Sequence, residues 1–130
     1  MAKMFATPWG RPDYEEQIAE GIIRGSTSSH GGYWLNAERW AELRRVLPTF
    51  HSFAGEGWLE EDSDWVAVYA VWPELAKPDE AFCVVRSFWT RKDVQGYWLT
   101  PQSAVLYEKA RPLIDAANLS DQFKVQQALL

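Results

Sequence analysis

The stretch that decides the N-terminal fold of this 130-residue chain reads Ile22-Ile23-Arg24-Gly25-Ser26-Thr27-Ser28-Ser29-His30-Gly31-Gly32-Tyr33-Trp34-Leu35. The β-branched residues at its start are typical of a strand, and the aromatic residues at its end can form a second strand. Small polar residues and two glycines separate the two runs, as in a turn. We therefore predict a loose antiparallel hairpin with His30 at its bend.

The segments next to this hairpin carry helix signals. Asp13 and Glu16 have the spacing of a capping box, which predicts a short helix over residues 12–20 that ends at Gly21. Asn36 is a good N-cap, and Pro48 lies just beyond the end of the periodic run, so a second helix is predicted over residues 37–46. The run 58–60 (Trp-Leu-Glu) can form a third strand.

The second half of the chain is predicted to be mostly helical. Residues 63–72 suit a strand or a helix, and we choose the helix because their apolar side chains recur at helical spacing and Pro73 follows. Further helices are predicted over 79–90 and 120–129. Thr100 and a proline start another helix that runs to about residue 117, with a kink at Pro112. Residues 96–99 are predicted to form a connection or a short strand.

The order of these elements predicts the fold class. The chain is long enough for one domain with its own core, so we expect a single domain over residues 1–130. We predict an α+β domain that is mainly helical, with a small antiparallel sheet in its N-terminal half.

Composition restricts the partners and the compartment. The chain has 13 basic and 18 acidic residues, a net charge of −5, so we expect no direct nucleic-acid binding. Cys83 is the only cysteine, which excludes an internal disulfide and favours a reducing cytoplasm, and we expect it to be a small buried apolar residue. Neither a signal peptide nor an apolar run of membrane-spanning length is found, so no membrane association is expected.

His30 is the first candidate for chemistry, because a histidine can act as a general base near neutral pH. Ser28 or Ser29 could be its nucleophile, with Asp62 or Asp64 as the acid that orients the imidazole. The glycine-X-serine-X-glycine pattern of a nucleophile elbow is missing. A turn residue is therefore the favoured interpretation of His30, and a small hydrolase-like enzyme is the alternative.

The two histidines and the nearby carboxylates are candidate metal ligands. The candidate ligands are His30, His51, Glu60, Glu61, Asp62 and Asp64. Their spacing matches neither a zinc motif nor a calcium loop, so we expect neither a metal nor another cofactor.

The acidic segment, residues 60–64, has tryptophans close to both of its ends and is the best candidate for partner binding. Its carboxylates can steer the chain to a basic protein surface, and its aromatic side chains can add affinity. We predict Trp58 as the aromatic anchor and Glu60, Glu61, Asp62 and Asp64 as the steering charges.

Two blocks carry a resemblance to a known family: Ser26-Thr27-Ser28-Ser29-His30-Gly31-Gly32 and Trp58-Leu59-Glu60-Glu61-Asp62-Ser63-Asp64-Trp65. Over about residues 9–75 the chain resembles a family of uncharacterised domains found in plasmid and phage proteins. The resemblance implies a protein of a mobile element, and small acidic proteins of such elements are often inhibitors of host defence, including anti-CRISPR and antirestriction proteins.

The expected function is therefore inhibition of a bacterial defence protein or complex, by binding to a basic or nucleic-acid-handling surface in the cytoplasm of the host cell. We expect binding rather than catalysis, with the His30 enzyme as one alternative. A homodimeric structural module that uses exposed tryptophans is the other. In each case we expect the hairpin bend to lie against the acidic segment.

Overall fold

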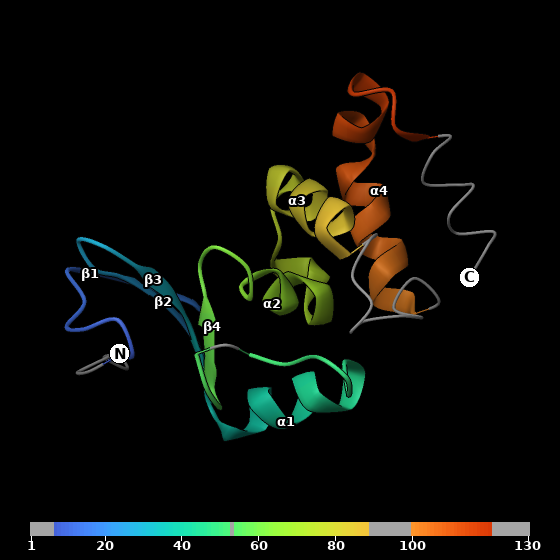
Figure 1. Cartoon of the computed structure of the whole chain (residues 1–130). Helices are drawn as coiled ribbons and strands as arrows, with labels where there is room; N and C mark the ends of the chain where they lie inside the picture. Colours follow the sequence, from blue (N-terminus) through green and yellow to red (C-terminus); the bar gives the residue numbers. More distant parts are fainter. Residues whose placement is uncertain (1–6, 53, 89–99, 121–130) are drawn as a thin grey trace. The chain divides into compact units, whose positions relative to one another are not determined.

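The computed structural model of the chain describes residues 7–52, 54–88 and 100–120. The chain forms two compact units, Met1–Ala67 and Val68–Leu130, which are described separately below. A four-stranded antiparallel sheet lies in the N-terminal half, and most of the helical residues follow it (Figure 1). The predicted α+β class is therefore confirmed. The prediction of a single domain stays a prediction.

The sheet of the first unit has the strand order β1-β2-β3-β4. The strands are β1 (Tyr14–Ala19), β2 (Ile22–Ser26), β3 (Gly31–Leu35) and β4 (Trp58–Glu60), and each pairs antiparallel with its neighbour in the order. The predicted hairpin is thus the β2–β3 pair, and the predicted third strand is β4. Both predictions are confirmed.

The predicted helix over residues 12–20 is wrong, because most of this segment is strand β1. Its residues pair with β2 from Tyr14 opposite Ser26 to Ala19 opposite Ile22, with a bulge between Gln17 and Ala19. An isolated helix of this length is marginal in water, whereas pairing with β2 gives partners to the backbone groups of β1 that face the hairpin.

A side-chain contact on β1 shows the strand geometry directly. Residues two apart lie on the same side of a strand, and the Tyr14 hydroxyl donates a hydrogen bond to Oε2 of Glu16 at 2.8 Å. This hydrogen bond, together with the negative charge of Glu16, raises the pKa of Tyr14 above its ordinary value. The pair would not face each other on a helix.

The turn between β1 and β2 connects the hairpin to helix α1 (Ala37–Val46). Gly21 has a φ of 81°, and its carbonyl oxygen accepts the N–H of Asn36 at 2.9 Å. Nε of Arg39 donates to the carbonyl oxygen of Glu20 at 2.9 Å. A Cβ atom at Gly21 would overlap the Asn36 side chain, with its Cγ at only 2.7 Å. Only glycine therefore fits this turn without displacing Asn36.

Helix α1 begins where the sequence predicts. Oδ1 of Asn36 accepts the N–H of Arg39 at 2.9 Å, so the predicted N-cap is confirmed. Leu43 faces the core of the first unit. The other large buried apolar side chains of this unit come from the sheet and from the segment after α1: Ile22, Ile23, Tyr33, Leu35, Leu47, Phe50 and Leu59.

Helix α2 (Val66–Val71) answers the question that residues 63–72 leave open. The segment is helical, as predicted, although the helix is shorter than the pattern. All six of its residues are buried. Pro73 follows and begins the 3-10 helix η1 (Pro73–Leu75), which is consistent with a proline that cannot continue the preceding helix.

Two helices of the second unit pack against each other. Helix α3 (Pro78–Phe88) packs against α4 (Pro101–Ala116), and both were predicted. Their buried side chains are Ala81, Val84, Val85, Phe88, Ser103, Leu106, Ala110 and Ile114. The predicted N-cap is confirmed, since Oγ1 of Thr100 accepts the N–H of Ser103 at 3.3 Å, and α4 continues through Pro112.

Cys83 is exposed on α3, so the expectation of a buried cysteine is wrong. The apolar face of α3 is formed by Ala81, Val84, Val85 and Phe88, and Cys83 lies on another side of the helix. The predictions for residues 96–99 and most of 120–129 lie outside the described residues. Among the described residues, no helix is long and apolar enough to cross a membrane.

One side chain of α4 holds the 3-10 helix η1. Nζ of Lys109 donates to three carbonyl oxygens, those of Pro73 at 2.8 Å, Glu74 at 3.1 Å and Ala76 at 2.9 Å. Three donors on one ammonium group thereby satisfy three backbone acceptors around a tight turn. Lys109 therefore joins α4 to the segment between α2 and α3.

We predict that Gly21→Ala lowers the free energy of unfolding by about 3 kcal/mol, from the left-handed backbone and from the overlap with Asn36. Gly55→Ala is the matched control, because Gly55 has a φ of 101° but open space around its Cβ position. We expect a loss of about 1 kcal/mol there. Urea unfolding measures both values, and equal losses would contradict the proposed overlap.

We predict that Lys109→Met lowers the free energy of unfolding by about 2 kcal/mol, because charged hydrogen bonds to partly buried carbonyls are lost. Arg111→Met removes a cation from the same helix, where Arg111 forms an exposed ion pair with Glu108 at 3.1 Å. Its expected loss is below about 0.5 kcal/mol. Thermal unfolding followed by circular dichroism compares them, and a Lys109→Met protein as stable as the control would refute the role of Lys109.

Candidate functional site

The bend between β2 and β3 is organised by one hydroxyl group. Oγ1 of Thr27 donates to the carbonyl oxygen of His30 at 2.7 Å and accepts the N–H of His30 at 3.0 Å and that of Ser29 at 3.3 Å. The N–H of Thr27 also donates to the His30 carbonyl oxygen at 2.7 Å. The backbone of His30 is thus fixed from both sides, while its side chain is exposed.

The pairing of β3 with β4 brings this bend to the acidic segment. Trp34 lies opposite Trp58, and Gly32 lies opposite Glu60. The same register continues beyond the strands, because the N–H of Glu61 donates to the carbonyl oxygen of Gly31 at 2.9 Å. One residue further, His30 comes opposite Asp62. The expectation that the bend lies against the acidic segment is confirmed.

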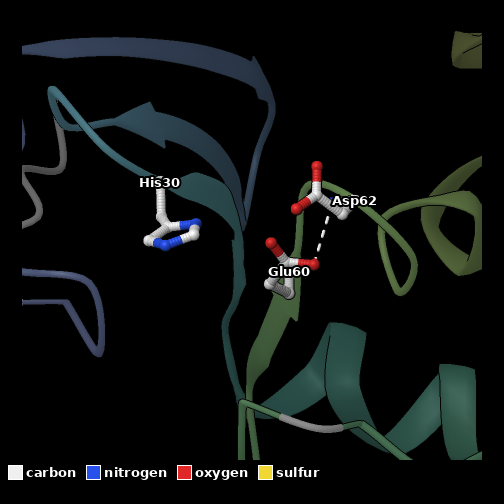
Figure 2. A group of neighbouring side chains, drawn as sticks. All are labelled: His30, Glu60 and Asp62. Carbon is white, nitrogen blue, oxygen red and sulfur yellow. Dashed lines mark hydrogen bonds between the residues drawn. The ribbon is translucent and has the colours of Figure 1, made fainter.

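His30, Glu60 and Asp62 therefore form one group of side chains. One ligand-type atom of each lies within 4.8 Å of those of the other two, and Figure 2 shows both carboxylates near the imidazole. Cross-strand partners share a face of the sheet, and so do residues two apart, which explains why these three meet. The N–H of Asp62 donates to Oε2 of Glu60 at 2.8 Å and so orients that carboxylate.

Two glycines allow the close approach of β3 to its neighbours. A Cβ atom at Gly32 would overlap the carbonyl oxygen of Leu59 and the ring of Trp9. A Cβ atom at Gly31 would lie 2.6 Å from the carbonyl oxygen of Gly25 and 3.0 Å from Oε2 of Glu61. The prediction that these glycines lie in the turn is wrong, because both are residues of strand β3, where they let β4 and Trp9 pack directly on the strand.

Trp58 lies on the same face of the sheet as Glu60. It is half-buried and meets Trp9 edge to face, with ring centroids 5.8 Å apart and an interplanar angle of 87°. The predicted anchor and two of the predicted charges, Glu60 and Asp62, are thus neighbours on one face.

The four predicted steering charges differ in exposure. Glu61 and Asp62 are exposed and Glu60 is half-buried, whereas Asp64 is fully buried. The Ser52 hydroxyl donates to the carbonyl oxygen of Trp58, and its Oγ lies 3.5 Å from Oδ2 of Asp64. Asp64 therefore has a structural position, and its carboxylate does not face solvent.

The residues of the enzyme alternative lie on an open surface. Ser28, Ser29 and His30 are all exposed in the bend, and Asp62 is the predicted acid that the structure brings near His30. His51 lies elsewhere, in a cavity of about 560 Å³ lined by Ala37, Trp40, Ala41, Arg44, Ser52, Gly55 and Glu56. The two histidines thus belong to different places in the first unit.

The grouping of His30 with Glu60 and Asp62 was not predicted as a site, although each residue was a candidate. The sequence could have indicated this group through the pairing register of β3 with β4. If Trp34 pairs with Trp58 in an antiparallel ladder, residues four positions before one and four after the other come opposite each other. His30 and Asp62 have this spacing.

Comparison with known proteins gives one family match. The family described as "Domain of unknown function (DUF7007)" matches residues 2–111. The match extends beyond residues 9–75, over which the sequence showed its resemblance, and reaches into α4. Neither a curated protein nor a solved structure matches the chain.

We predict that Thr27→Val speeds hydrogen exchange at the amide of His30 and lowers the free energy of unfolding by about 1–2 kcal/mol, because the hydroxyl that organises the bend is lost while its volume is kept. Ser28→Ala is the control, since Ser28 is exposed in the same bend. Nuclear magnetic resonance measures the exchange rates. Unchanged exchange at His30 in the Thr27→Val protein would show that the hydroxyl does not hold the bend.

Proposed function

The chain belongs to the DUF7007 family of domains of unknown function, and we propose that it is a binding protein that inhibits a bacterial defence protein. In this proposal the acidic turn, which we define as Glu60 at the end of β4 with Glu61 and Asp62 after it, docks on a basic, nucleic-acid-handling surface of the target. The site of action is the cytoplasm of the bacterial host. Neither catalysis nor direct contact with nucleic acid is required.

The observation that carries the proposal is the acidic turn itself. Three consecutive carboxylates, those of Glu60, Glu61 and Asp62, lie on a backbone that hydrogen bonds hold on both sides. Gly31 accepts the N–H of Glu61, and the carbonyl oxygen of Glu60 accepts the N–H groups of Asp64 and Trp65, each at 3.0 Å. A pre-organised turn loses little conformational entropy on binding, so its charges favour association at low cost.

Charge and aromatic surface support the same proposal. The net charge of −5 attracts a basic partner over a long range and speeds the encounter. Trp58 is half-buried and lies on the same face of the sheet as Glu60, and tryptophans are frequent anchors of interfaces. Asp64 is left out of the proposed surface because it is buried.

The identity of the target rests on the two blocks that resemble plasmid and phage proteins. A protein of a mobile element gains from blocking the host systems that destroy foreign nucleic acid. Such systems carry basic surfaces for DNA or RNA, and an acidic turn is complementary to these surfaces. CRISPR and restriction complexes are therefore the targets we propose.

One observation favours the enzyme as a second candidate. His30 lies near Asp62, which is the pairing that orients a general base, and Ser28 and Ser29 are in the same bend. The exposure of the whole bend argues against it, because such catalysis works best where water is excluded. A His30→Ala protein that still captures its target would separate the two candidates.

We predict that a variant with Glu60→Gln, Glu61→Gln and Asp62→Asn captures a defence component from a bacterial lysate at least about tenfold less well than the wild-type protein. Each exposed ion pair contributes up to about 1 kcal/mol, so three losses reach this factor. The pull-down uses a host with CRISPR and restriction systems, and a chelator is present throughout.

The matched control carries Glu74→Gln, Glu108→Gln and Asp115→Asn, which change the net charge equally at exposed positions of the second unit. It should capture the target like the wild-type protein. Failure of the wild-type protein to recover any defence component would contradict the proposal, as would equal losses in both variants.

Light scattering on the purified wild-type protein tests the homodimer alternative. A homodimer should have twice the chain mass of 15.0 kDa.

A further inference from the structure

We propose that His30, Glu60 and Asp62 form a binding site for a divalent zinc-class cation, with Zn²⁺ as the preferred ion. The site goes beyond the proposed function and is measured without any partner protein. Two of its ligands come from the acidic turn, and the third comes from the bend of the β2–β3 hairpin, thirty residues earlier in the sequence (Figure 2).

The donor set selects the class of ion. One imidazole nitrogen and two carboxylate oxygens are typical ligands of Zn²⁺, which accepts nitrogen and oxygen donors together. Calcium and magnesium ions prefer oxygen ligands, so the imidazole nitrogen is a poor ligand for them. The histidine therefore distinguishes this group from a run of surface carboxylates. Three protein ligands leave a fourth tetrahedral position for water or for a ligand from another molecule.

The distances fit such an ion after small side-chain movements. The three ligand atoms lie within 4.8 Å of one another. Ligands around tetrahedral Zn²⁺, with bonds of about 2.0–2.1 Å, lie about 3.3 Å apart. Rotation about the side-chain bonds of the exposed His30 and Asp62 closes this difference while the backbone stays in place. The approach brings two negative carboxylates together, and the cation compensates this repulsion.

Hydrogen bonds around the three ligands hold their backbone and one carboxylate in place. Thr27 fixes the backbone of His30, and the hydrogen bond from Asp62 N–H to Oε2 of Glu60 leaves Oε1 of that carboxylate for the ion. The hydrogen bond from Glu61 N–H to Gly31 fixes the distance between the two segments. Outer contacts of this kind orient metal ligands and raise affinity. Glu61, between the two acidic ligands, does not belong to the group.

The test is a titration of the tag-free full chain with Zn²⁺, measured by isothermal titration calorimetry. We expect one Zn²⁺ per chain, with binding at least about tenfold weaker in His30→Ala, Glu60→Gln and Asp62→Asn. Two variants are matched controls. Glu61→Gln removes a neighbouring charge outside the group, and His51→Ala removes the other histidine of the chain. Both should bind like the wild-type protein.

Proton nuclear magnetic resonance gives an independent readout, because the chain has two histidines. Zn²⁺ should shift the imidazole signals that are missing from the spectrum of His30→Ala, and should leave those of His51 in place. The His30→Ala protein keeps its fold in this test if its other signals are unchanged.

Three results would overturn the proposal: no binding by the wild-type protein, equal weakening in the controls, or Ca²⁺ binding that is as tight as Zn²⁺ binding and indifferent to His30→Ala. The last result would identify a simple pair of carboxylates. Because no partner is present, failure here leaves the capture experiment with chelator unaffected, and failure of capture leaves the Zn²⁺ titration unaffected.

Discussion

The pairing of β3 with β4 is the constraint on which the rest of the first unit depends. Gly32 lies so close to the backbone of Leu59 and the ring of Trp9 that a side chain would be excluded. This contact fixes the register, and the register alone decides that His30 meets Asp62 rather than Glu61. A shift by one residue would turn every side chain of β4 to the other face of the sheet.

The same constraint divides the acidic segment into parts with different roles. Glu60 and Asp62 lie on the side of His30, whereas Asp64 is buried next to Ser52. Two neighbouring carboxylates repel each other, and a nearby positive charge relieves this repulsion. A lysine or arginine of a partner would supply that charge, and so would a metal ion. The proposed docking surface and the proposed cation site therefore rest on one physical property, an accumulation of negative charge on a rigid turn.

Much of this fold could be predicted because its signals are local. Asn36 and Thr100 mark helix starts through their own side chains, and the hairpin follows from a strand, a small-residue turn and a second strand. Strand β1 was not predicted, because Asp13 and Glu16 have the spacing of a helix N-terminus. In the structure, the long-range pairing of this segment with β2 overrides that local signal. The grouping of His30 with Glu60 and Asp62 was not predicted for a related reason. His30 lies thirty residues before Glu60 in the sequence, and spacing rules for short motifs do not include residues that only strand pairing brings together.

Exposure finally separates the two interpretations of the bend. A histidine that acts as a general base works with a substrate held in a pocket, and the cavity of about 560 Å³ in this unit is lined by His51 instead. His30 is exposed in the bend, near the carboxylates of Glu60 and Asp62. Such a surface can hold an ion or a protein partner, since both bring their own charge and need no enclosure. This is the reason that we favour recognition over catalysis in our proposal for the bend.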